Sequence, residues 1–239
     1  MADAAAMNSE TASRPAEAIL TLNNVEVVYD DARHYILTTD QKFDAVTSDP
    51  LDPWVKGAAT LYTEEFFNVV KQHLNPGGVV TLFVQLYESN EEAVKSEIAT
   101  FFEAFPNGVV WGNTNNGAGY DLVLLGQVGP TTIDVDAVQR KLQRPEYAPM
   151  AQSLREIGMN SAVDLFSTFA GRASDLAPWL QDASINRDRN LRLQFLAVDF
   201  KIHFRPFAAA DPVPLHQLER IAPVDRVQVA QEPLGVRGN

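Results

Sequence analysis

Strand-like and helix-like segments alternate through the first half of the sequence, and this alternation restricts the fold more than any other feature. Val25–Tyr29 and Phe43–Ser48 are short and rich in β-branched and aromatic residues, while Ala32–Thr39 between them can form a short helix. Val79–Leu86 is too apolar for a strand with one face in water, so we expect it near the centre of a sheet. The order predicts an α/β fold with a mostly parallel sheet.

Two helices of this half carry start and stop signals. Glu64–Leu74 follows Thr63, a favoured N-cap residue, and the run Asn-Pro-Gly-Gly at 75–78 is expected to stop it. Ser89 and Glu92 have the spacing of a capping box. The apolar residues after them recur on one helical face, which we expect to be core: Val94, Ile98, Phe101, Phe102 and Phe105.

The pattern of predicted elements changes towards the end of the sequence. Val109–Trp111 and Tyr120–Leu125 predict an antiparallel pair joined by the loop 112–119, and Asn186–Asn190, with its arginines, predicts a solvated turn or helix face. Short helices are expected at Asp134–Gln143, Ala148–Ile157, Ser161–Ala170 and Ser174–Leu180. The chain is therefore divided into a flexible leader (1–18), an incomplete α/β domain (19–129), a helical segment (130–197) and a poorly ordered tail (198–239).

Composition excludes several classes of protein. The 31 acidic and 19 basic residues give a net charge of -12, which argues against nucleic-acid binding. The same charge fits a cationic ligand, and ordinary solubility equally well. With no cysteine, disulfides and thiolate catalysis are excluded. No apolar run reaches membrane-helix length and the start lacks a secretory signal, so a cytoplasmic location is expected.

The stretch FDAVTSDPLDP, from Phe43 to Pro53, predicts where the chemistry lies. A short strand ends in Asp49 and Asp52, and a proline follows each aspartate. Ligands of open α/β sheets bind beyond the carboxyl ends of the strands. Two aspartates on a stiff loop there suit a cation, either a metal or an amine, although aspartates also simply cap turns.

Three stretches, VVYDDARHYI, FDAVTSDPLDP and LYTEEFFNVVKQHLNPGGVV, resemble the second half of the catalytic domain of spermidine synthases, the polyamine aminopropyltransferases. The resemblance is strongest to the spermidine-synthase-like domain that some bacteria carry fused behind a transporter-like membrane region, and it covers roughly residues 24–127. It implies a partial Rossmann-like methyltransferase sheet followed by a helical C-terminal segment. It also implies decarboxylated S-adenosylmethionine as co-substrate, a polyamine substrate, and no permanently bound cofactor.

The resemblance also implies a role for individual residues. Asp49 would be the base that takes a proton from the attacking amine, and Asp52 would bind that amine together with Gln85. The co-substrate would be held by a second group, in which the aspartate accepts from the adenine amino group: Asp31, Ala32 and Pro53. No metal site is expected, since His34 and His73 have no second ligand at i+4.

The sequence departs from the family pattern in ways that open alternatives. The family's glycine-rich nucleotide loop does not precede Val25, and Lys56 brings a positive charge into the acidic loop. Without the strands that belong to that loop, Phe43–Ser48 becomes an exposed edge, so we expect a homo-oligomer or a partner chain that completes the sheet. The alternatives are an S-adenosylmethionine-dependent methyltransferase and a non-catalytic module that binds a polyamine or a partner protein.

Overall fold

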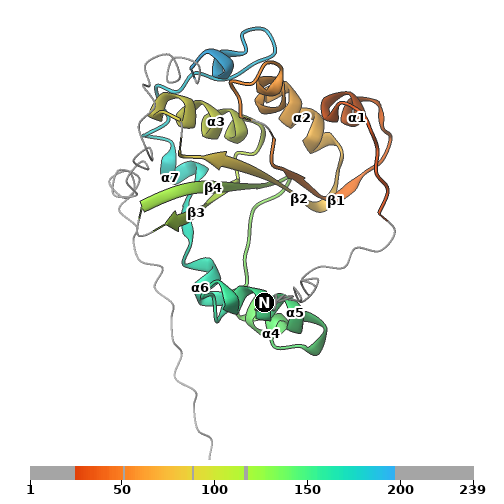
Figure 1. Cartoon of the computed structure of the whole chain (residues 1–239), viewed down its shortest axis with the longest axis vertical. Helices are drawn as coiled ribbons and strands as arrows, with labels where there is room; N and C mark the ends of the chain where they lie inside the picture. Colours follow the sequence, from red (N-terminus) through yellow and green to blue (C-terminus); the bar gives the residue numbers. More distant parts are fainter. Residues whose placement is uncertain (1–24, 51, 88, 116–117, 197–239) are drawn as a thin grey trace, which may run out of the picture. The chain divides into compact units, whose positions relative to one another are not determined.

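The computed structural model describes residues 25–50, 52–87, 89–115 and 118–196 (Figure 1). The predicted leader, residues 1–18, and the tail from 198 lie outside the described residues. The chain divides into two compact units, one formed by Met1–Val28 with Asp134–Leu165 and the other by Tyr29–Ile133 with Phe166–Asn239. The second unit contains the sheet and all the residues singled out for chemistry.

A five-stranded mixed sheet forms the second unit, so the predicted α/β class is confirmed. Its strands, β1 (Phe43–Ser48), β2 (Leu74–Gln85), β3 (Val109–Asn115), β4 (Ala118–Gln127) and β5 (Phe169–Arg172), lie in the order β1-β2-β4-β3-β5. Among the described residues, β1 and β2 are the one pair of strands that run parallel, and the other three pairings are antiparallel. The expectation of a mostly parallel sheet was wrong, because only the β1–α2–β2 connection is a crossover between neighbouring parallel strands.

Three helices, α1 (Ala32–Thr38), α2 (Glu64–Gln72) and α3 (Glu91–Ala104), cover one face of the sheet (Figure 1). Thr63 caps α2 as predicted, accepting from the Phe66 backbone N–H at 3.2 Å. The predicted Ser89 cap of α3 was wrong: Asn90 is the N-cap and accepts from the Ala93 N–H at 2.9 Å. Asn90 holds this place because its amide also donates to the Leu196 carbonyl.

The core lies between these helices and the sheet. All five residues of the predicted apolar face of α3 are buried, and the Phe67 ring meets the Phe101 ring edge-on at 5.3 Å between centroids. The sheet supplies the opposite wall from β2 and β4, with Val80, Leu82, Val84, Leu122 and Leu124. The aliphatic side chains of the strands pack against the aromatic side chains of the helices, and this packing sets the distance between α3 and the sheet.

Gly126 lies under the aromatic rings of α3 and offers a test of this packing. A Cβ at Gly126 would lie 2.6 Å from Cγ of Phe105 and 2.9 Å from Cζ of Phe101. Because both rings are fully buried, Gly126→Ala is expected to lower the free energy of unfolding by about 1–3 kcal/mol in urea denaturation. The control is Gly129→Ala, where a Cβ meets nothing within 4 Å. Equal stability of the two variants would contradict the packing described.

The predicted strand Val25–Tyr29 does not form in the described residues. Val25, Val27, Val28 and Tyr29 are between 49% and 97% exposed. A strand is stable only with a neighbour, and β1, the first strand of the sheet, pairs with β2 alone among the described residues. The prediction that Phe43–Ser48 forms an edge of the sheet is therefore confirmed for this part of the chain.

The helical segment is only partly as predicted. Asp134 caps α4 (Val135–Leu142), and α5 (Ala148–Glu156) follows after a short 3₁₀ turn at Pro145–Tyr147. The predicted helix Ser161–Ala170 shrinks to α6 (Ala162–Phe166), and β5 takes the next residues, because they pair with the free edge of β3. A last short helix, α7, spans Ala173–Leu176. No helix in the described ranges has the length and apolar character needed to cross a membrane.

Candidate functional site

Polar side chains meet at one end of the sheet, where β1 and β2 finish and β4 begins. In the strand pairing, Gln85 of β2 lies opposite Asp121 of β4, which in turn lies opposite Asn113 of β3. Directly opposed residues project from the same face of a sheet. Beside them, Asp49 follows the last residue of β1, so the predicted base and the predicted amide Gln85 belong to the same end of the sheet.

Four carboxyl groups, which we call the acidic cluster, lie in this region: Asp49, Asp52, Glu97 and Asp121. Burial raises the pKa of Asp121, the Asn113 side chain lowers it through a hydrogen bond, and the charge of Asp49 raises it again. Burial also raises the pKa of Tyr62, as do the charges of Glu97, Asp52 and Asp49. Since the charge of Asp52 also acts on Glu97, each carboxyl of the cluster lies close to another member or to Tyr62.

Two tyrosines accompany the acidic cluster. Tyr62 is 3% exposed and ends the 3₁₀ helix η1 (Ala58–Tyr62), directly before α2. Tyr87 follows β2, and its ring lies 4.8 Å from that of Tyr120 between centroids. Burial raises the pKa of Tyr87, and Tyr120, Asp52, Asp121 and Asp49 raise it further. Both phenols therefore stay neutral at physiological pH.

Glu97 is a member of the cluster that the sequence analysis missed. It lies on the buried side of α3 with only 2% of its surface exposed, and its Oε1 has no hydrogen-bond partner among the described residues. Burial raises the pKa of this carboxyl well above its ordinary value, and the charge of Asp52 raises it further. The signal was present in the sequence: Glu97 stands between Val94 and Phe101 at helical spacing, on the face expected to be apolar.

The predicted amine-binding residues are placed as follows. Asp52 is half-buried, whereas Asp49 is exposed at the end of β1. Gln85 is 6% exposed, and its Nε2 has no hydrogen-bond partner among the described residues. Lys56, which could have opposed a cation, is exposed to solvent. The structure thus brings Asp49, Asp52 and Gln85 to one end of the sheet, although their roles stay predictions.

The residues predicted to bind the co-substrate are spread more widely. Asp31 is the N-cap of α1, is exposed, and accepts from the His34 backbone N–H at 2.9 Å. Ala32 and Ser48 line the same apolar cavity of about 300 Å³, which lies against β1, α1 and α2. Pro53 is buried next to the acidic loop. One cavity thus extends from the start of α1 to the residue before Asp49.

The expectation of a solvated turn at Asn186–Asn190 holds for residues 188–190, which form an exposed turn, and fails for Asn186, which is fully buried. The Asn186 backbone N–H donates to Oγ1 of Thr100 at 2.9 Å, and its side-chain amide donates to the Ala59 carbonyl at 2.9 Å. Its Oδ1 accepts from the Leu193 N–H, and its own carbonyl accepts from the Glu64 N–H. Asn186 therefore joins η1, α2 and α3 behind the acidic cluster.

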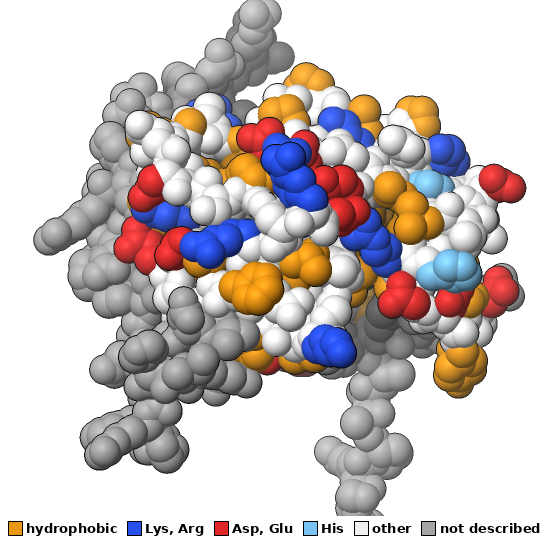
Figure 2. All heavy atoms as spheres, turned by 90° about the horizontal axis from the view of Figure 1, so that it is seen from above, with side chains coloured by type: hydrophobic (Ala, Val, Ile, Leu, Met, Phe, Trp, Pro, Cys, Tyr) orange, Lys and Arg blue, Asp and Glu red, His pale blue; other side chains and the backbone are white. Residues whose placement is uncertain are grey.

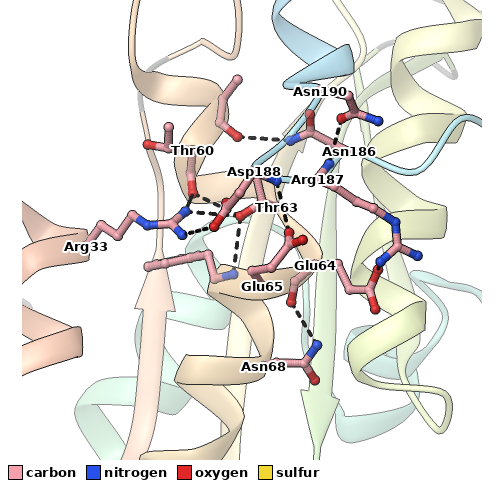
Figure 3. A network of polar contacts seen from close by, with 12 residues as sticks. Arg33, Thr60, Thr63, Glu64, Glu65, Asn68, Asn186, Arg187, Asp188 and Asn190 are labelled. Atoms are coloured by element: carbon pink, nitrogen blue, oxygen red, sulfur yellow. Dashed lines mark hydrogen bonds and ion pairs between the residues drawn. The ribbon is translucent and has the colours of Figure 1, made fainter.

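Basic residues of the helical face are engaged in ion pairs rather than facing the acidic cluster. Arg33 of α1 donates to the Thr60 carbonyl at 2.6 Å and to Oγ1 of Thr63 at 3.1 Å, and it pairs with Asp188 (Figure 3). Further pairs on this face are Arg187–Glu64, Arg192–Glu92 and Lys95–Asp182. Figure 2 shows acidic and basic side chains interspersed over the face that these helices present.

The charges acting on Glu97, Asp121, Tyr62 and Tyr87 come from acidic groups and tyrosine alone. Among the described residues, no three His, Asp or Glu side chains form a group that could hold a metal ion. The carboxyl groups come from a loop, a helix and a strand. An elongated organic cation can satisfy carboxylates spaced in this way, because its charges are themselves separated by carbon atoms.

Comparison with known proteins points to one enzyme family for part of the chain. Residues 13–110 match the spermine/spermidine synthase domain. The polyamine aminopropyltransferase of Aeropyrum pernix is 40% identical over 83 residues, which make up 33% of this chain and 26% of that protein. Polyamine aminopropyltransferase 1 of Pseudomonas aeruginosa is 32% identical over 78 residues, 30% of this chain and 27% of the relative. The chain thus spans about a quarter of the length of these relatives.

Two solved structures align with part of the chain. A probable spermidine synthase from Corynebacterium glutamicum aligns over 66% of this chain and 52% of its own, with 21% identity and a TM-score of 0.43. Human methyltransferase-like protein 13, solved in complex with SAH, aligns over 54% of this chain and 59% of its own, with 19% identity and a TM-score of 0.39. Distant partial homologues of this chain are therefore polyamine aminopropyltransferases.

Proposed function

We propose that the acidic cluster binds a protonated diamine or polyamine, and that the chemistry of this site is aminopropyl transfer. The observation that carries the proposal is the set of acidic side chains whose charges act on Tyr62, Glu97 and Asp121, namely those of Asp49, Asp52 and Glu97, with no basic group among them. Alkyl amines are cationic at neutral pH, because their pKa lies near ~10. The match of residues 13–110 to the spermine/spermidine synthase domain supports the same ligand class.

In the proposed reaction, Asp52 holds the amine and Gln85 orients it. Asp49 accepts the proton that the ammonium must lose before its nitrogen can attack. When bound, decarboxylated S-adenosylmethionine supplies an electrophilic methylene next to its sulfonium. The new C–N bond forms there as the C–S bond breaks, and methylthioadenosine leaves. The exposed position of Asp49 allows it to pass the proton on to water.

Part of the structure fits this co-substrate. Asp31 uses one carboxylate oxygen to cap α1, which leaves the other for an adenine amino group. The cavity of about 300 Å³ between Ala32 and Ser48 leads from that position towards Asp49. A methyltransferase donor fits less well, because the carboxylate of S-adenosylmethionine would be repelled by the acidic cluster.

A second candidate is a non-catalytic polyamine-binding module. It is favoured by the position of β1, which ends the sheet among the described residues with one side unpaired. In the part of the chain that the structure describes, no further strand stands beside the cavity that would take the nucleotide. Under this candidate the acidic cluster binds amines and no transfer takes place.

Titration calorimetry with 1,4-diaminobutane and with methylthioadenosine tests the proposal, followed by an assay for transfer from decarboxylated S-adenosylmethionine. Binding of both ligands with turnover is the expected result, and Asp49→Asn should then abolish turnover while methylthioadenosine still binds. Binding of the diamine alone would leave the non-catalytic module as the function. If neither ligand binds, the acidic cluster is not an amine site and both candidates are wrong.

A further inference from the structure

We propose that Glu97, a buried carboxyl with an oxygen that has no hydrogen-bond partner among the described residues, is a second anionic anchor of the amine site and pairs with the second ammonium group of a bound diamine. This inference rests on the proposed amine-binding function and names the ligand class more narrowly. It requires a dication rather than a monoamine. Its proton balance is one ligand bound and one proton released from the Glu97 carboxyl.

The position of Glu97 within α3 supports this role. Residues on the same face of this helix, Val94, Ile98 and Phe101, are buried and apolar. An aliphatic side chain at position 97 would pack against them without loss, whereas a buried carboxyl with an unpartnered oxygen lowers stability. A residue that weakens the fold in this way is typical of a functional site.

The groups that surround Glu97 also support this role. α3 packs against η1, α2 and β2. Tyr62 of η1 and Asp52 of the acidic loop are the titratable groups that interact with its carboxyl. On α2, Glu64 is paired with Arg187, and Lys71 donates to the Ala104 carbonyl at 2.7 Å. No cation among the groups acting on Glu97 is therefore available to satisfy it before a ligand arrives.

The charges around Glu97 favour its pairing with a ligand that carries two ammonium groups. Burial and the negative charge of Asp52 hold the pKa of Glu97 above its ordinary value of 4.5. An ammonium group that pairs with Asp52 removes that repulsion, and a second ammonium on the same ligand favours the ionised form of Glu97 directly. Because water is largely excluded from this carboxyl, a charge brought near it acts strongly. Gln85, whose Nε2 lacks a partner among the described residues, lies at the same end of the sheet.

The experiment is calorimetry of the whole chain with 1,4-diaminobutane and 1-aminobutane in two buffers of different ionisation enthalpy. The wild-type protein is expected to bind the diamine more tightly than the monoamine and to release about one proton with the diamine. Glu97→Gln keeps the shape of the neutral acid, so it should still bind the monoamine. It should release no proton and bind the diamine roughly tenfold more weakly.

Glu103→Gln is the matched control, because Glu103 is an exposed glutamate on the same helix. It should behave as the wild type in both titrations. The proposal is overturned if Glu97→Gln keeps the preference for the diamine, or if it still releases a proton. If the wild type binds neither amine, the proposed function fails together with this inference, whereas amine binding without proton release refutes the inference alone.

Stability against pH gives a readout that does not depend on any ligand. Glu97 has a raised pKa in the folded protein, so its ionised form is favoured in the unfolded chain. Stability is therefore expected to fall as pH rises above the ordinary value of 4.5 towards the raised value. Urea denaturation at several pH values should show this fall in the wild type and in Glu103→Gln, and a smaller one in Glu97→Gln. An identical pH profile for Glu97→Gln would show that the carboxyl is not buried as described.

Discussion

Asn186→Ala is expected to lower the free energy of unfolding by about 3 kcal/mol, which corresponds to a fall in Tm of roughly 10 °C for a chain of this size. The substitution removes the amide donor to the Ala59 carbonyl and the oxygen that accepts from the Leu193 N–H. Asn186 is fully buried, so both backbone partners would be left without water to replace it. Differential scanning calorimetry and urea denaturation measure the loss.

Asn190→Ala provides the control for this prediction. Asn190 also accepts from a backbone N–H, that of Arg187 at 2.9 Å, but its side chain is exposed and water can take its place. A loss of about 1 kcal/mol or less is expected there. If the two variants lose the same stability, segment 186–192 does not join η1, α2 and α3 in the way described.

Asp52→Asn is expected to weaken the binding of 1,4-diaminobutane by about 10- to 100-fold. Hydrogen bonds to a charged group contribute about 1.5–3 kcal/mol, and each 1.4 kcal/mol corresponds to a factor of ten in affinity. Asp52 is half-buried and its charge acts on Tyr62, Tyr87 and Glu97. Calorimetry at constant ionic strength measures the change.

The matched control for Asp52→Asn is Asp44→Asn. Asp44 is an exposed aspartate of β1 that accepts from the Asn75 amide at 2.8 Å and is not part of the acidic cluster. Both substitutions remove one negative charge from the chain, so a general effect of net charge would weaken binding equally in both. Equal weakening would therefore refute a specific role for Asp52.

Local signals in the sequence predicted the strongest elements well. The Thr63 cap, the limits of β1 and the buried face of α3 are confirmed, because each depends on residues a few positions apart. β5 could not be predicted in this way. Phe169–Arg172 becomes a strand only because the edge of β3 is free and the Phe169 ring meets Trp111 edge-on at 5.6 Å. Such pairing depends on residues far apart in the sequence, which a local pattern does not record.

The residues of the candidate site also fall into those that the sequence predicted and those that it did not. Asp49, Asp52 and Gln85 were predicted from their positions at the ends of strands and from a family resemblance. Glu97 was missed because the periodicity of α3 was used to find apolar residues, and a charged residue on that face was not weighed. Asn186 was misread as solvated because its neighbours are charged, whereas only the fold shows that η1, α2 and α3 surround it.

The dependence of α3 on late residues has a consequence for the order of synthesis. Ser96 donates to the Ser184 carbonyl at 2.6 Å, and the Asn186 N–H donates to Thr100, contacts that span 88 and 86 residues of sequence. β3 likewise acquires its outer neighbour only when β5 has been made. Contacts between distant residues form slowly, so the nascent chain carries an incomplete sheet until residue 172 has been made, and α3 lacks these two contacts until residue 186 has been made. A fragment cut after residue 133 would keep the resemblance to aminopropyltransferases and lose the segments that hold it folded.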